Sequence, residues 1–258
     1  MNRLEQLRKL NQILLSEQPQ YQKQAADFPL KLQSQWRLFR SLVNVREPKP
    51  AGKAFLELQD NLLKEMIAEK GITKISSLMP LQENIYLWQG DITTIQVDGI
   101  VNAANSGMTG CYYPCHGCID NGIHTFAGVQ LRLECAAIMK EQGCPEPTGT
   151  AKITKAYNLP CHYVLHTVGP IVTGKLTEKD CVLLASCYQS CLELAEKNHL
   201  KSLAFCCIST GEFHFPNQKA AEIAVKTVKE FLSAHTEISV VFNVFQDRDY
   251  EIYRNLLS

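Results

Sequence analysis

The chain has 258 residues with 26 acidic and 26 basic side chains, so its formal net charge is zero. This balance argues against a general binder of nucleic acid or of an anionic membrane surface, although backbone amides can still hold a small anion. The N-terminus is charged rather than a secretory signal, and no apolar run approaches the roughly 20 residues of a membrane span. The 11 cysteines are odd in number and unevenly spaced, which favours reduced thiols in a cytoplasmic protein.

Residues 1–73 are predicted to form a helical extension. The segment is rich in good helix formers, and leucines recur at helical spacing at Leu4, Leu7, Leu10 and Leu14. A last helix is expected over residues 55–70, ending at Gly71. We find no catalytic constellation here and interpret the extension as a cap packed on the main domain, with partner recognition as the alternative.

Strands alternate with helices in residues 74–258, which we assign to a second domain. We expect strands at residues 84–88, 99–102, 153–159, 163–168, 202–208 and 238–245, and helices at 123–140, 181–197, 218–233 and 248–257. This alternation predicts a three-layer α/β/α domain with a mixed, mainly parallel sheet. Ligands bind at the carboxyl ends of such strands, so the loops after residues 102, 208 and 245 should converge.

A cluster of soft metal ligands stands in the middle of this domain. Within eight residues the chain carries Cys111, Cys115, His116 and Cys118. Thiolates and imidazole are ligands that zinc prefers, and three protein ligands leave a position open for substrate or water. We predict one zinc ion on Cys111, His116 and Cys118, with Cys115 either a fourth ligand of a structural site or turned away. Cysteines without metal remain an alternative, because the spacing is not that of a standard zinc finger.

Polar residues at strand ends add further candidates. Asp91 and Asn105 each follow a strand, where Asp91 can accept from an amine or a ribose hydroxyl, or can act as a turn residue or helix cap. Asp120 can orient or deprotonate a water beside the metal, or cap the next helix. Amides of the loop 209–213 can cradle a pyrophosphate, although a plain strand-to-helix connector would look the same.

Taken together, these motifs resemble the macrodomain family over residues 75–258. Four separated motifs stand in the family's order: Gly-Asp-Ile-Thr at 90–93, Val-Asn-Ala-Ala-Asn-Ser at 101–106, Asp-Asn-Gly-Ile-His at 120–124, and Ile-Ser-Thr-Gly at 208–211. The resemblance implies ADP-ribose binding, with Asp91 at the adenine amine, Ile92 alongside and Phe245 near the adenine. Asn105 is then expected at the distal ribose. The other expected ligand contacts are Cys118, Ile119, Asp120, Ser209, Thr210, Gly211, Glu212 and Phe213.

The loop 108–118 departs from the Gly-rich loop of common macrodomains. Its cysteines and histidine are similar to those of the zinc-dependent subgroup of microbial protein-ADP-ribose hydrolases, and the helical extension also fits that subgroup. The resemblance implies zinc on Cys111, His116 and Cys118 and removal of mono-ADP-ribose from an acidic side chain of a modified protein. Asn105 and Asp120 are the expected catalytic residues.

Members of the subgroup often sit beside a sirtuin-type ADP-ribosyltransferase and a lipoylated carrier protein, so such a carrier is a candidate substrate. Two other functions also fit the sequence. The chain could instead be a non-catalytic ADP-ribose-binding module with a structural zinc, or a metal-free redox sensor.

Overall fold

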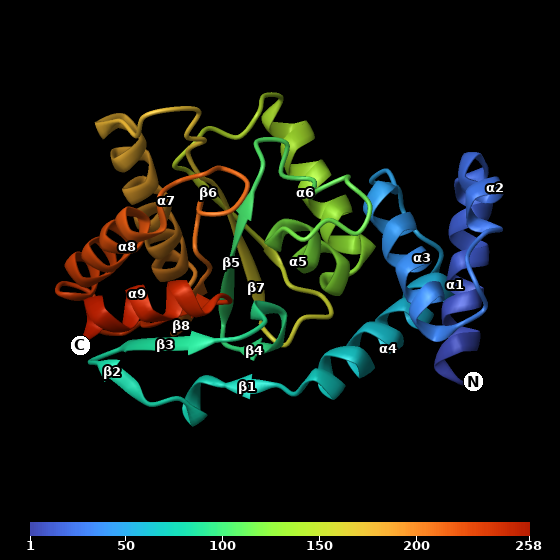
Figure 1. Cartoon of the computed structure of the whole chain (residues 1–258), viewed down its shortest axis with the longest axis horizontal. Helices are drawn as coiled ribbons and strands as arrows, with labels where there is room; N and C mark the ends of the chain where they lie inside the picture. The colour runs from blue at the N-terminus through green and yellow to red at the C-terminus, as the bar shows by residue number, and fades with distance from the viewer.

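The computed structural model describes residues 1–258 and contains a helical N-terminal segment followed by an α/β domain (Figure 1). The N-terminal helices are α1 (Arg3–Glu17), the short α2 (Gln22–Ala25), α3 (Leu32–Val45) and α4 (Lys53–Lys70). Asn2 and Glu5 form a capping box that satisfies free amides at the start of α1. The helix α4 ends at Gly71, as the sequence predicts.

The α/β domain contains one large sheet and one small one. Their strands are β1 (Thr73–Lys74), β2 (Pro80–Gln82), β3 (Ile85–Gln89), β4 (Ile95–Gln96), β5 (Gly99–Ala104), β6 (Ala151–Lys155), β7 (Tyr163–Val168), β8 (Ser202–Phe205) and β9 (Ser239–Val244). The seven-stranded sheet has the order β2-β3-β9-β8-β5-β7-β6, and β1 pairs with β4 in parallel. Only the edge strands β2 and β6 run antiparallel to their neighbours. The predicted mixed, mainly parallel sheet is therefore confirmed.

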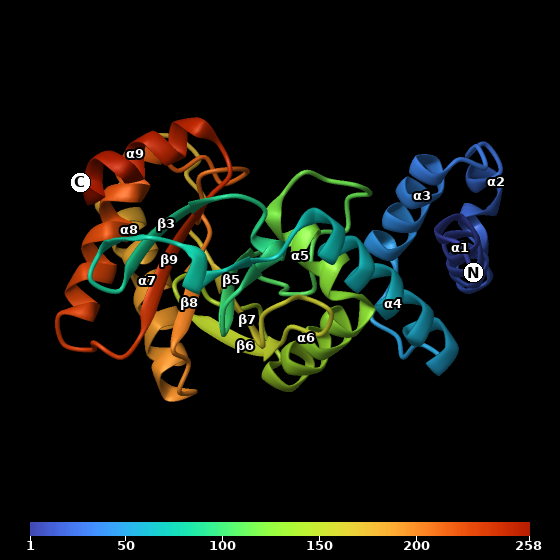
Figure 2. The same ribbon diagram turned by 90° about the horizontal axis from the view of Figure 1, so that it is seen from below.

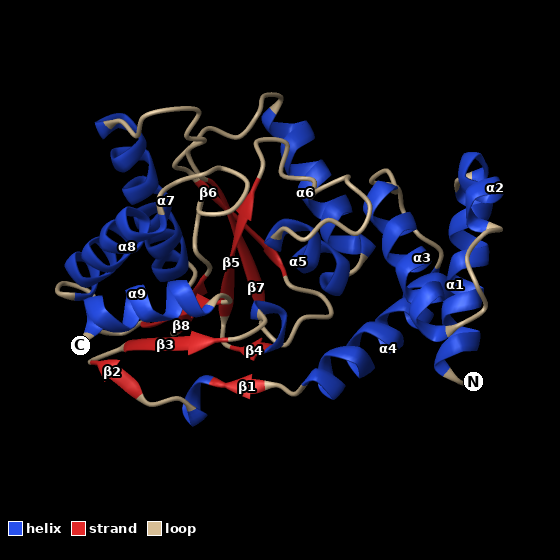
Figure 3. Ribbon diagram, in the orientation of Figure 1, coloured by secondary structure: helices blue, strands red, loops and turns tan.

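Helices cover both faces of this sheet. They are α5 (Ile119–Ala127), α6 (Val129–Gln142), α7 (Glu178–Lys197), α8 (Asn217–Leu232) and α9 (Asp247–Leu257). The helices α7, α8 and α9 lie on one side of the strands, and α5 and α6 lie on the other (Figure 3). A core of 44 buried hydrophobic residues fills the space between these layers. The three-layer α/β/α architecture is thus confirmed.

One predicted helix is wrong. The sequence predicts a single helix over residues 123–140, but the structure has α5 and α6 with a break at Gly128. Gly128 has a φ of +99°, and a Cβ there would lie 2.6–2.9 Å from side-chain atoms of Gln59, Gln130 and Asn158. The expected strand 153–159 is also displaced to Ala151–Lys155, because the chain turns at Tyr157, which has a φ of +55°.

The helical extension packs against the α/β domain through α3 and α4, which lie beside α5 (Figure 2). Its core is a cluster of 11 buried hydrophobic residues, of which Val129 comes from α6 and the others, among them Leu7, Leu10, Phe39 and Leu62, come from the extension. Phe126 on α5 packs against both this core and the core of the α/β domain. None of the helices has the combination of length and apolar character that crossing a membrane requires.

Candidate active site

The strand β5 and the helix α5 position two of the predicted catalytic side chains. Asn105 follows the carboxyl end of β5, and Asp120 lies in the first turn of α5. The Asp120 carboxylate accepts hydrogen bonds from Asn102 Nδ2 at 2.8 Å and from Asn105 Nδ2 at 3.3 Å. Asp120 therefore does not cap α5; the N-cap position belongs to Cys118.

Burial shapes the electrostatics around Asp120. Desolvation raises the pKa of its carboxyl to about 6, although hydrogen bonds from Asn102 and Asn105 and the charge of Arg132 act in the opposite direction. On the same helix, His124 Nε2 lies 3.5 Å from Asp120 Oδ1. Desolvation lowers the pKa of His124 well below its ordinary value, so this imidazole is neutral at physiological pH.

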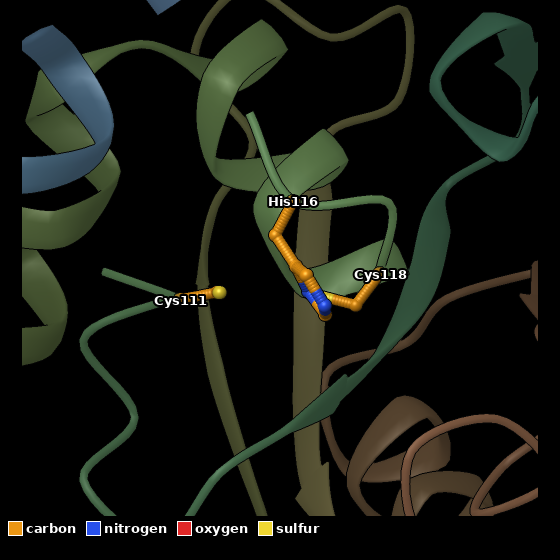
Figure 4. A group of neighbouring side chains, drawn as sticks. All are labelled: Cys111, His116 and Cys118. Atoms are coloured by element: carbon orange, nitrogen blue, oxygen red, sulfur yellow. The ribbon is translucent and has the colours of Figure 1, made fainter. Parts of the chain in front are cut away.

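The structure brings Cys111, His116 and Cys118 together. One ligand atom from each residue lies within 4.8 Å of the other two. Figure 4 shows Cys111 pointing from one side toward His116 and Cys118 on the other. A zinc ion bonds sulfur at about 2.3 Å and imidazole nitrogen at about 2.0–2.1 Å, so a group of this size fits one ion after a small contraction.

Two further properties of this group suit a soft divalent cation. His116 Nδ1 is buried and has no hydrogen-bond partner, which is costly unless something else satisfies it. Burial raises the pKa of the Cys118 thiol to about 12, so binding a cation there must release a proton from the thiol. The donor set and the unpartnered nitrogen therefore fit zinc.

Cys115 is turned away from the other three side chains. Its Sγ lies 3.3 Å from Ser41 Oγ and 3.4 Å from the carbonyl oxygen of Arg37, both on α3. Its φ of +54° places it in the left-handed region, where the chain reverses between Tyr113 and His116. This arrangement leaves three protein donors, a number that keeps one zinc coordination position free for another ligand. The set of Cys111, His116 and Cys118 as zinc ligands stays a prediction.

The loop after β8 approaches the group of Cys111, His116 and Cys118. Glu212 Oε1 lies 3.6 Å from His116 Nε2, which places residues 209–213 beside the loop 110–118. Within the loop, Phe215 N donates to the Ser209 carbonyl at 3.0 Å, and α8 begins two residues later. Two of the three loops predicted to converge therefore meet, while the pyrophosphate contacts remain a prediction.

The residues predicted at the adenine are arranged as follows. Asp91 caps the 3-10 turn Ile92–Thr94, where its Oδ1 accepts from Thr93 N at 3.0 Å and its Oδ2 accepts from Lys70 Nζ at 2.8 Å. Burial acts to raise the pKa of Asp91, but hydrogen bonds from Lys70 and Thr93 outweigh burial and the net direction is downward. Ile92 is buried and Phe245 is 77% exposed. The cap interpretation of Asp91 is confirmed, and its adenine contact stays a prediction.

Comparison with known proteins decides the family. Residues 101–224 match the model of the Macro domain family. A protein-ADP-ribose hydrolase of Treponema medium is 57% identical over 254 residues, which cover 96% of this chain and 97% of that protein. The chain belongs to the Macro domain family.

Other relatives agree with this macrodomain assignment. A protein-ADP-ribose hydrolase of Staphylococcus aureus (strain MRSA252) is 48% identical over 232 residues, covering 88% of this chain and 86% of that one. The Oceanobacillus iheyensis macrodomain with ADP is 36% identical, with a TM-score of 0.64 and coverage of 70% and 93%. The Trypanosoma brucei macrodomain in complex with ADP-ribose is 31% identical, with a TM-score of 0.65 and coverage of 85% and 95%.

A second buried group, formed by His124, Cys135 and His166, adjoins the site of this macrodomain through the 3.5 Å approach of His124 Nε2 to Asp120 Oδ1. The Asn102 amide donates to His166 Nδ1 at 3.1 Å as well as to Asp120, which leaves His166 Nε2 protonated and 2.9 Å from Thr154 Oγ1. Both ring nitrogens of His166 are thus engaged. The ring nitrogens of the buried His124 have no hydrogen-bond partner. We interpret His166 as part of a neutral network with Asn102 and Thr154, which occupies both of its nitrogens and argues against a second metal site.

Sequence reasoning missed several residues that hold the site. Asn102 is a completely buried amide within the apolar strand β5, and Arg132 is a buried cation on the inner face of α6. Each breaks an otherwise apolar pattern, which is the signal that could have found it. Arg40 and Asn44 on α3 carry no such signal, because their partners lie more than 70 positions away in the sequence.

Proposed function

We propose that this macrodomain is a protein-ADP-ribose hydrolase that uses one zinc ion to remove mono-ADP-ribose from an acidic side chain of a modified protein. The observation that carries the proposal is the grouping of three zinc-type donors beside Asp120 and Asn105. Its support from relatives is the name of the Treponema medium protein, which is similar over nearly the whole chain. The acidic linkage is inferred from the likeness of the Cys/His loop to the zinc-dependent subgroup.

The residues of the chain divide the work in this proposal. Cys111, His116 and Cys118 would hold zinc, which as a Lewis acid would polarise an oxygen of the bond to be cleaved. Asn105 Nδ2 donates to the Gly110 carbonyl and to Asp120, and its Oδ1, which accepts from Gly107 N, keeps a second lone pair that can accept from a ribose hydroxyl. Asp120 is held by two amides, so its carboxylate can accept a hydrogen bond from a ribose hydroxyl or a water in one fixed orientation.

The Cys118→Ala variant should lose the release of ADP-ribose from a protein mono-ADP-ribosylated on glutamate, because one of only three zinc ligands is missing. Release is measured chromatographically, with a modified lipoylated carrier as a second substrate and Cys144→Ala, an exposed thiol outside the site, as the matched control. The wild type should contain one equivalent of zinc, and ADP-ribose binding should persist in the folded variant.

The outcomes separate this function from its competitors. Full turnover by wild-type protein stripped of metal with a chelator would refute the zinc mechanism. ADP-ribose binding without any hydrolysis of either substrate would favour a non-catalytic module. Purified protein without zinc, whose thiols oxidise reversibly, would favour a redox sensor.

A further inference from the structure

The loop that carries Cys111, His116 and Cys118 has few internal contacts that fix its conformation. Residues 105–118 contain no helix or strand. Between positions 109 and 118, the internal backbone hydrogen bond is that from His116 N to the Tyr113 carbonyl, at 3.2 Å. Ordering such a loop around a metal costs conformational entropy for each residue that becomes fixed. Its shape must therefore be imposed by the groups that contact it from outside.

The helix α3 of the extension supplies one such group in Arg40. Its guanidinium donates to the His116 carbonyl at 2.7 Å and to Asn121 Oδ1 at 2.8 Å and 3.2 Å. Asn121 in turn donates from Nδ2 to the Tyr113 carbonyl at 3.0 Å. Arg40 and Asn121 together thus hold both ends of the turn that presents His116. These bonds are charge-assisted on the arginine side, which makes them stronger than neutral ones.

Asn44, one helical turn further along α3, contacts the same turn of the loop at Cys115. Its Oδ1 accepts from Cys115 N at 2.9 Å, and its Nδ2 donates to Thr125 Oγ1 at 3.1 Å. Asn44 is only 1% exposed, so these bonds have no competition from water. They also stabilise the reversal at Cys115, which directs its thiol toward α3 and away from the other donors.

Arg132 connects the end of α3 to the other side of the loop. Its Nη1 donates to the carbonyls of Val43, Asn44 and Arg46, which the helix end leaves free. Its Nε donates to the Thr109 carbonyl at 2.7 Å, and its Nη2 donates to the Cys111 carbonyl at 3.4 Å. One buried cation therefore ties the backbone of Cys111 to α3.

We propose that α3 is the positioning element of the metal-binding loop, and that Arg40 and Asn44 hold the loop in the shape that brings Cys111, His116 and Cys118 together. The helical extension is then part of the site rather than a separate cap. The identity of the ion rests on the proposed function, but the shape of the loop does not. In Figures 1 and 2, α3 lies between α1 and α5, which is where such a support must stand.

The test compares Arg40→Ala with Arg37→Ala, which removes the same charge from the same helix. The Arg37 side chain is exposed and makes no hydrogen bond or ion pair. Zinc affinity is measured by competition with a chromophoric chelator, and the thiolate-to-cobalt absorption of cobalt-substituted protein reports the coordination. Residues that support a metal ligand typically change affinity by 10- to 100-fold, so we expect about a tenfold loss in Arg40→Ala and none in Arg37→Ala.

Two further variants separate positioning from folding. Arg40→Lys keeps a cation that can reach the His116 carbonyl, so it should recover part of the affinity. Asn44→Ala should release the Cys115 amide, and circular dichroism and thermal melting identify any variant that fails to fold. Amide hydrogen exchange over residues 110–118 of metal-free protein provides a readout without an ion. We expect faster exchange in Arg40→Ala and Asn44→Ala than in wild type.

The outcomes distinguish this inference from the proposed function. Wild-type zinc affinity and wild-type exchange in folded Arg40→Ala and Asn44→Ala would overturn the role of α3, whatever the activity. A wild-type protein that binds no zinc would overturn the zinc mechanism, while the exchange measurement would still decide whether α3 holds the loop.

Discussion

Asn102 illustrates how one buried amide organises the centre of this macrodomain. It occupies a position in β5 where an apolar side chain would ordinarily pack, and it is completely buried. Its two amide hydrogens go to Asp120 and to His166, so the orientation of the carboxylate depends on a strand, a helix and a neighbouring strand at once. A network of this kind holds each side chain in one rotamer, which a reacting group requires.

At the residue scale, His166 predicts a pH dependence of stability. Desolvation lowers its folded-state pKa to about 3. It is surrounded by Asn102 from β5, Thr154 from β6, Cys135 from α6 and the neutral His124 from α5. In the unfolded chain the histidine pKa is about 6.5, so as the pH falls the unfolded chain binds this proton at a higher pH than the folded protein does. Stability should therefore be complete above pH 6.5 and should fall on acidification, by about 2 kcal/mol between pH 7 and pH 5 from this group.

The measurement is denaturant unfolding of metal-free protein at several pH values. His166→Gln should unfold with a shallower pH dependence over this range, because the group that titrates only in the unfolded chain has been removed. An equally steep dependence in the variant would assign the acid sensitivity to other groups, of which the buried His124 is the first candidate.

At the scale of elements, the break between α5 and α6 decides where the site sits. Gly128 separates the two helices with a φ of +99° and a ψ of 171°, a combination that is essentially restricted to glycine. The break turns α6 so that Arg132 reaches the loop carbonyls while α5 presents Asp120. A continuous helix over the same residues could not direct both side chains to one place.

Gly128→Ala should therefore be costly. The new methyl group adds backbone strain of about 1–3 kcal/mol and overpacking of about 1–3 kcal/mol against Gln59 and Asn158, so we expect a loss of about 4 kcal/mol in the free energy of unfolding. Gly143→Ala is the control, since Gly143 also has a positive φ but no atom within 4 Å of the added Cβ. Gly143 lies in the left-handed helical region with a ψ of 4°, so equal losses, measured by denaturant unfolding, would show that neither crowding nor the extended ψ of Gly128 adds to the cost.

At the scale of the whole molecule, the extension and the α/β domain share a seam. Phe126 packs on both hydrophobic cores, and Lys70 Nζ lies 3.6 Å from the centroid of its ring while pairing with Asp91. The Lys70–Asp91 pair is partly exposed and contributes little by itself. The two parts are joined by the apolar contact of Phe126, by the contacts between α3 and the loop 110–118, and by hydrogen bonds of Gln59 and Asp60 on α4 to Val129 and Asn158.

Phe126→Ala should weaken this joint. Because Phe126 is only partly buried, we expect a loss of about 2 kcal/mol, less than the 3–5 kcal/mol of a fully buried phenylalanine. In a Trp88→Phe background, which leaves Trp36 as the fluorophore, the protein with Phe126 should unfold in one transition. Phe126→Ala should show a separate, earlier transition of the extension when Trp36 fluorescence is compared with far-ultraviolet circular dichroism. Coincident transitions in the variant would show that Phe126 does not couple the two cores.

Local pattern was sufficient for much of this protein. Apolar periodicity located the strands around Ile100 and Val241, the helix that ends at Gly71 and the alternation that makes an α/β sheet, because each depends on neighbours within one or two turns of chain. The grouping of Cys111, His116 and Cys118 was also readable, since the three lie within eight residues of one another.

Tertiary structure alone decided what supports that group. The direction of the Cys115 thiol, the double role of Asn102 and the contacts of Arg40 and Arg132 join residues that are far apart in the chain, and no local preference encodes such a meeting. The break at Gly128 was missed for the same reason, because glycine within a helical pattern is tolerated unless distant side chains occupy the space where a Cβ would be. The sequence by itself determined which chemical groups are available, and the packing of α3, α5 and α6 against β5 determined which of them meet.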